Sequence, residues 1–231
     1  GVVAQDCLQY GVLVRTLPAD ETIDMAHAVV GEADIIYVAA GAEGLLVYQI
    51  PDSGPLFRLA ELDLPGTAYD VALHGTYLLV AGGTSGLYVV DVGAPSAPVL
   101  ATSLATPGND VRELSVIGDE AYLFGTNWAC EGEGSDLLRV DISNPATPQF
   151  LGASAAGAYA TAMDRSENLL ALGIAEYWWE QMGPNWFECV GHAALRLLDV
   201  TNPANPAVLA NDILYEMPAG VAILGDHLYL A

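Results

Sequence analysis

Aromatic, acidic and cysteine side chains gather in two segments of this 231-residue sequence, 125–136 and 174–193. All four tryptophans fall there, and each segment holds one cysteine. Tryptophan and tyrosine offer large rigid rings for stacking, and an acidic rim suits a sugar ring or a basic or aromatic peptide. The competing interpretation is that these rings only pack on one another as a small local core. The candidate contact residues are Trp128, Tyr177, Trp178, Trp179, Trp186, Phe187, Glu131, Glu176 and Glu188.

The two cysteines in these segments, Cys130 and Cys189, allow three interpretations. We predict a disulfide between them, a cross-link that typically contributes about 2–4 kcal/mol and requires an oxidising compartment. The second is a metal site formed by both thiolates, His192 and a nearby carboxylate. Because Cys-x-x-His supplies only two ligands, the sequence favours the disulfide, and we expect no metal and no other cofactor. Free buried thiols are the third interpretation.

The segments that must position these residues belong to a repeat. Its core is a short apolar strand, a proline-rich turn and a second strand, and copies begin at Leu45, Leu87, Leu137 and Leu195. Upstream of each copy lie two more short strands around a glycine or polar turn, as in YDVALHG-TYLLVAGG at 69–83. Four antiparallel strands in about 40 residues is the pattern of a propeller blade. We therefore predict an all-β fold, a β-propeller of four-stranded antiparallel blades.

Three copies share an apolar strand that ends in Asp: LYVVDV at 87–92, LLRVDISNPATP at 137–148 and LRLLDVTNPANP at 195–206. In the last two, Asn-Pro and a second Pro follow. This pattern resembles the LVIVD repeat of bacterial and archaeal surface proteins, although the first copy, YQIPDSGP at 48–55, lacks both the Asp and the Asn-Pro. The resemblance implies a β-propeller in an extracellular or cell-envelope setting. It implies no reaction, because propellers serve many unrelated functions.

The two ends of the chain together supply a fifth blade. GVAILGDHLYLA at 220–231 corresponds to its first two strands, and GVVAQD at 1–6 with YGVLVRTL at 10–17 to its last two. We expect residues 2–6 to pair with residues 227–231, because a closed ring leaves no open sheet edge. A fragment of a larger propeller is the alternative. The single domain 1–231 then divides into blades at about 24–66, 67–108, 109–157, 158–217, and 218–231 plus 1–23.

The first strand of each blade lines the central channel of a propeller. Alignment of the repeats places Asp70 and Glu113 at equivalent positions there, and two carboxylates from neighbouring blades could hold a hard cation. Arg112, beside Glu113, offers a simpler ion pair, which the sequence favours. The equivalent positions in the other blades are Thr161, Ala26 and Gly220.

The two segments rich in aromatic residues are insertions at one place in the repeat. From second strand to third strand the spacing is 8 residues in the first two copies, 15 in the third and 25 in the fourth. Equivalent loops of a propeller emerge on one face, so we expect two neighbouring long loops. Insertions confined to one face of a repeat protein often mark the binding face.

The charge balance restricts the class of partner. The chain has 29 acidic and 6 basic residues, every basic one is Arg, and the net charge is −23. Such a chain repels phosphate backbones and anionic lipid surfaces, so we expect neither nucleic-acid binding nor membrane insertion. Solubility outside the cell or adaptation to salt would also explain it. Because residue 1 is Gly, we expect a processed or trimmed chain whose signal peptide has been removed.

No known catalytic motif occurs in the sequence, including G-x-S-x-G, the P-loop and H-E-x-x-H. We therefore predict a non-catalytic binding module, extracellular or in the cell envelope, that meets an unidentified protein, peptide or carbohydrate on its aromatic, acidic face. One alternative is a hydrolase or lyase that uses carboxylates at the channel mouth or on the loop face. Another is a purely structural domain of a surface protein.

Overall fold

The computed structural model describes residue 17 and residues 22–106, 110–126, 136–155, 159–184, 186–202, 204–216, 218–225 and 227–231. Every regular element in these ranges is a β-strand. They contain no helix of the length and hydropathy needed to cross a membrane.

The strands form four four-stranded antiparallel sheets and a fifth sheet of two strands, each in sequence order. The first sheet holds β1 (Ala28–Glu32), β2 (Ile35–Ala39), β3 (Leu45–Gln49) and β4 (Phe57–Leu62), and the second holds β5 (Asp70–His74), β6 (Tyr77–Ala81), β7 (Leu87–Asp91) and β8 (Val99–Leu104). The third holds β9 (Asp110–Ile117), β10 (Glu120–Thr126), β11 (Asp136–Asp141) and β12 (Gln149–Ala155). The fourth holds β13 (Tyr159–Ser166), β14 (Leu169–Gly183), β15 (Trp186–Asp199) and β16 (Ala207–Leu214), and the fifth holds β17 (Val221–Leu224) and β18 (His227–Leu230).

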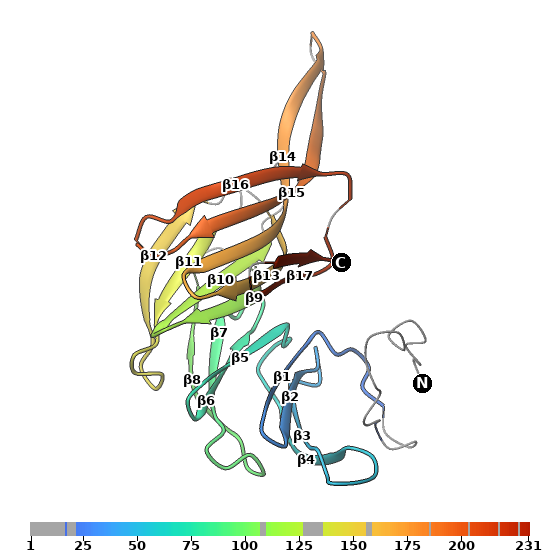
Figure 1. Ribbon diagram of the computed structural model, residues 1–231, viewed down its shortest axis with the longest axis vertical. Helices are drawn as coiled ribbons and strands as arrows, with labels where there is room; N and C mark the ends of the chain where they lie inside the picture. Colours follow the sequence, from blue (N-terminus) through green and yellow to red (C-terminus); the bar gives the residue numbers. More distant parts are fainter. Residues whose placement is uncertain are drawn as a thin grey trace.

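The sheets are arranged as the blades of a propeller around their first strands. Contacts between blades run from β1 to β5, β9, β13 and β17 in turn (Figure 1). The predicted all-β propeller is thus confirmed, with five sheets. Residues 2–6, the predicted partners of residues 227–231, lie outside the described residues, so this pairing stays a prediction.

Both faces of the middle strands of the second blade are buried, because this blade packs between the first and the third. In β6, Leu78 and Val80 pack toward the first blade, whereas Leu79 and Ala81 pack toward the third. A third cluster joins the third and fourth blades through residues such as Phe124. This explains why the middle strands are continuous apolar runs rather than alternating ones.

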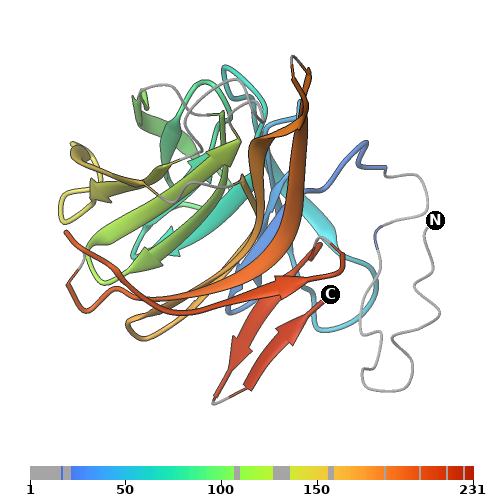
Figure 2. The same cartoon turned by 90° about the horizontal axis from the view of Figure 1, so that it is seen from above.

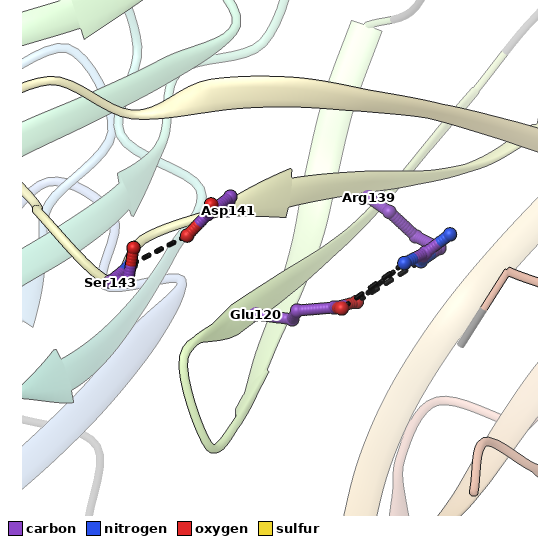
Figure 3. Close-up of polar contacts among 4 residues, drawn as sticks. All are labelled: Glu120, Arg139, Asp141 and Ser143. Carbon is purple, nitrogen blue, oxygen red and sulfur yellow. Dashed lines mark hydrogen bonds and ion pairs between the residues drawn. The ribbon is translucent and has the colours of Figure 1, made fainter. Parts of the chain in front are cut away.

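The Asp that ends the third strand of a repeat caps the turn that follows. Its Oδ1 accepts a hydrogen bond from the backbone N–H two residues later, at 2.9 Å for Asp91 and 2.8 Å for both Asp141 and Asp199. Figure 3 shows this contact between Asp141 and Ser143. Hydrogen bonds from the side chain and backbone of that second residue lower the pKa of the Asp141 and Asp199 carboxyls.

The Asn-Pro that follows the Asp forms a β-turn. In the third blade the Thr147 N–H donates to the Asn144 carbonyl at 2.9 Å, and Pro145 lies inside this turn. The equivalent bonds join Ala97 to Ala94 at 2.8 Å and Asn205 to Asn202 at 3.0 Å. The capping Asp and the preset φ of proline therefore explain the signature of the repeat in local terms.

The second insertion differs from the long loop that the sequence predicts. β14 and β15 continue through it as one antiparallel ribbon, with register pairs from Leu169↔Asp199 to Gly183↔Trp186. This ribbon projects beyond the blade (Figures 1 and 2). The prediction of a loop was wrong because Tyr, Trp, Phe and Val favour extended backbone wherever a partner strand is available. We call residues 176–192 the arm. Most of the first insertion, 127–135, lies outside the described residues.

Candidate functional site

The central channel is a cavity of about 450 Å³, lined by the first strands of four blades. Its walls combine aliphatic residues such as Val71 and Leu114 with the charged side chains of Asp70, Asp164 and Arg165. A cavity of this size could admit a small ligand. It is the first of two candidate functional sites that we consider among the described residues.

Carboxylates on three of the first strands, β5, β9 and β13, join each of these strands to the first strand of the next blade. Asp70 on β5 accepts a hydrogen bond from the Leu114 N–H of β9 at 2.8 Å, and its other oxygen accepts one from Val71 at 2.8 Å. Glu113 on β9 accepts a hydrogen bond from the backbone N–H of Met163 on β13. These two acids thus tie the second blade to the third and the third to the fourth.

A third contact of the same kind continues the series. Asp164 on β13 accepts a hydrogen bond at 2.6 Å from the backbone N–H of Ile223 on β17. The repeat alignment missed Asp164, because it lies two residues beyond the position of Asp70 and Glu113, and its equivalents in the second and third blades, Ala72 and Ser115, are not acidic. Counted back from the hairpin turn, Ala162 and Ala28, rather than Thr161 and Ala26, are equivalent to Asp70 and Glu113. The register of β13 shifts between Ala160 and Ala162, and this bulge explains why Thr161 was aligned in place of Ala162, since a bulge leaves no signal in a sequence alignment.

Burial shifts the protonation of the first two carboxyls. Desolvation raises the pKa of Asp70 to about 6 although two backbone hydrogen bonds lower it. Desolvation, together with the charge of Asp70, raises the pKa of Glu113 to about 8. Near neutral pH the pair therefore favours an ionised Asp70 beside a protonated Glu113.

The expected ion pair between Arg112 and Glu113 does not form. Arg112 donates instead to Asp110, with nitrogen–oxygen distances of 2.8 and 3.0 Å. Its guanidinium carbon lies 4.5 Å from the centre of the Tyr69 ring. The physical reason is a β-bulge: the register of β9 against β10 shifts at Arg112, which has no cross-strand partner there, and its side chain reaches Asp110 and Tyr69 instead. Among the described side chains, no group of three or more His, Cys, Asp or Glu residues is placed to hold a metal ion.

The arm is the second place that could carry a function. β13 pairs with β14 only as far as Ala175, and β16 pairs with β15 only from Ala193. Beyond these points, each strand of the arm has the other as its sole described strand partner. At the tip, the Gln181 amide donates to the Gly183 carbonyl at 3.0 Å and helps to close the turn.

Several side chains of the arm are open to solvent. Trp186 is 60% exposed and Met182 is 48% exposed, so neither side chain is part of a packed core. Glu180 and Glu188 are both exposed and lie directly opposite each other across the ribbon. At the base of the arm, where β16 ends, Tyr215 is fully exposed. The described part of the arm is thus aromatic, acidic and accessible.

The remaining predicted contact residues are only partly within the described structure. For Glu176, Tyr177, Trp178, Trp179, Phe187 and Cys189 the strand backbone is described but the side chains are not. Trp128, Cys130 and Glu131 lie outside the described residues, so the disulfide and the thiolate metal site stay predictions.

An ion pair that the sequence analysis did not single out fixes the strands leading into the first insertion. Arg139 on β11 donates from Nε and Nη2 to the Glu120 carboxylate on β10 at 3.0–3.1 Å (Figure 3). Burial, and then the charge of Glu120, raises the pKa of the neighbouring Tyr122 to about 12. The pair links β10 and β11, the two strands that residues 127–135 connect.

Comparison of folds defines the class of protein. The chain is similar to the Myceliophteria thermophila Cps50 (Swd1) beta-propeller domain, with a TM-score of 0.57 and 10% identity over 82% of this chain and 59% of that one. It is also similar to the computationally designed Ika8 protein, with a TM-score of 0.55 and 11% identity over 93% of this chain and 70% of that one. The chain is a β-propeller.

The chain spans only about half, 52%, of a Saccharomyces cerevisiae chain in a structure of Dbp5 bound to Nup159. Over 91% of this chain, that similarity has a TM-score of 0.50 and 16% identity. No curated protein matches the sequence. The LVIVD repeat family matches residues 65–106 and 125–155. The protein is therefore a β-propeller that carries LVIVD repeats, as the sequence predicts.

Proposed function

We propose that this β-propeller is a non-catalytic binding module of the cell exterior or cell envelope, and that the arm is its contact surface. A propeller with LVIVD repeats is a scaffold for interaction or structural roles. The observation that carries the proposal is the exposure of Trp186, 60%, on a ribbon that extends beyond its blade. A large apolar ring left in water is unfavourable unless a partner covers it.

The chemistry of the arm favours a sugar, or a basic or aromatic peptide. Trp186 offers a ring for stacking, and Glu180 and Glu188 provide negative charge beside it. With a net charge of −23, the whole chain adds a field that attracts cationic partners and repels polyanions. A location outside the cytoplasm fits the acidic surface and the predicted disulfide.

The experiment compares two aromatic truncations on peptide and glycan arrays. Trp186→Ala should remove binding to the ligands that the wild-type chain retains, with affinity falling by about tenfold or more. Phe57→Ala is the matched control, because Phe57 on β4 is equally exposed, 62%, and lies outside the arm. If both variants bind as the wild type does, the arm is not the contact surface.

A second candidate function is catalysis in the channel. The observation that favours it is the pair formed by Asp70, which lines the cavity, and the neighbouring Glu113, whose pKa values of about 6 and 8 would suit a base and an acid. Both carboxylates, however, accept backbone hydrogen bonds from strand amides, which is a structural task. A hydrolase or lyase would lose activity on a glycoside or uronide panel when Glu113 is replaced by Gln, and a binding module would show no activity to lose.

A further inference from the structure

The arm has an outer backbone edge that no described strand occupies. On the β15 side, β16 stops at Leu214 opposite Ala193, whereas β15 runs on to Trp186. At about 3.3 Å per residue, the open stretch from Trp186 to Gly191 is roughly 20 Å long. Its outward N–H and C=O groups are a template for another extended chain.

The position of this edge favours an added strand in line with β16. A segment placed there would continue the fourth sheet where β16 ends and would lie antiparallel to β15. The described chain after β16 turns away from the arm toward β17 (Figure 1). Tyr215 at the base and Trp186 at the tip, both exposed, provide an aromatic contact at each end.

Charge decides which kind of segment fits. Glu180 and Glu188 are directly opposite on neighbouring strands, an arrangement that destabilises a ribbon through repulsion. The ion pairs recorded among the described residues join other acids to arginine or histidine, and neither of these glutamates takes part. A third strand bearing Lys or Arg beside Glu188 would relieve the repulsion. A second copy of this chain would bring the same acids and a further −23 charge, so self-association here is unfavourable.

We propose that the open edge of β15, from Trp186 to Gly191, binds an extended basic segment of a partner protein by β-strand addition. This inference rests on the proposed function, since it specifies how the arm binds. Backbone hydrogen bonds to β15 supply affinity without regard to sequence, and the Glu180–Glu188 pair selects for positive charge. The partner is thus defined by an exposed strand that alternates basic and β-forming residues.

The test uses the full chain and a synthetic peptide of about ten residues that alternates Lys and Thr. We expect saturable binding, at least about tenfold weaker for a Glu-Thr peptide of equal length. Hydrogen exchange of the backbone amides at 186–191 should slow on binding, because added-strand bonds protect them. The Lys-Thr peptide with alternate nitrogens methylated cannot form these bonds and should lose the protection and about tenfold in affinity.

Variants of the chain separate this inference from the proposed function. Glu188→Gln should weaken Lys-Thr binding about threefold or more, whereas Asp63→Asn, which removes an exposed charge from the first blade, should not. If the methylated peptide binds as tightly as its parent and Trp186→Ala still abolishes binding, strand addition is overturned while the arm remains the contact surface. If the Lys-Thr peptide does not bind, but binding of a ligand found on the arrays is lost in Trp186→Ala, the basic-strand proposal alone fails. If Trp186→Ala changes nothing, the proposed function itself fails.

Discussion

Asp70 and Leu114 lie 44 residues apart in the sequence, yet the Asp70 carboxylate accepts the Leu114 N–H at 2.8 Å and ties the second blade to the third. Glu113 and Asp164 repeat the contact toward the fourth and fifth blades. Neighbouring first strands of a propeller do not share a β-ladder, so their amides need other acceptors when buried. The acidic residues of the channel meet that need.

Removal of one such acceptor should destabilise the propeller. Asp70→Asn keeps one carbonyl oxygen but places an amide NH₂ near N–H donors, which leaves a buried donor unsatisfied. We expect the free energy of unfolding to fall by about 1–3 kcal/mol. Urea denaturation measures it, with Asp63→Asn as an exposed control. Equal urea midpoints for the two variants would show that the Asp70–Leu114 hydrogen bond contributes no measurable stability.

The channel carboxyls should make stability depend on pH. The folded-state pKa values of Asp70 and Glu113, about 6 and about 8, lie above their ordinary values of 3.8 and 4.5, so the folded state binds protons more tightly than the unfolded state. The unfolding free energy should therefore decrease as pH rises from about 4 to 8. Glu113→Gln removes its share of this dependence. A variant whose stability falls as steeply as that of the wild type between pH 6 and 8 would contradict the raised pKa of Glu113.

The arm should be dispensable for folding. In the second blade, the five residues Gly82–Gly86 join β6 to β7, with Ala81 paired to Leu87. Since Ala175 and Ala193 are also a register pair, residues 176–192 can be replaced by Gly-Gly-Thr-Ser-Gly without changing the register below. We expect the melting temperature to change by less than about 4 °C and all binding to be lost. A variant that unfolds as a whole would instead show that the arm belongs to the core.

The predicted bond between Cys130 and Cys189 has a direct test. Peptide mapping without reduction should recover the two cysteine-containing fragments as one cross-linked species. Reduction should leave the far-ultraviolet circular dichroism of the sheets intact, because the cross-link joins two insertions rather than two blades. Separate fragments with alkylated thiols would exclude the disulfide, and the Cys130→Ser variant controls for adventitious oxidation.

Much of the fold could be predicted because its determinants are local. The Asp–Asn–Pro sequence at 141–145 caps a strand and turns the chain within a few residues, so the repeat is visible without coordinates. The same holds for the two-residue turns between first and second strands, where Gly75 and Gly118 adopt positive φ. The sequence could not decide whether Trp186 is buried or exposed, since an aromatic side chain suits a core and a binding surface equally well.

The sequence by itself determined the strands, their turns, the blade as a unit and the place of the insertions, because each depends on residues near one another in the chain. Only the tertiary structure decided that the second insertion continues as paired strands and that Arg112 faces Asp110 rather than Glu113. It also decided that the Asp164 carboxylate reaches the backbone of Ile223, 59 residues away. The physical reason is the same in each case. Each of these contacts depends on register, on bulges or on the angle between blades, and these are set by the packing of whole sheets.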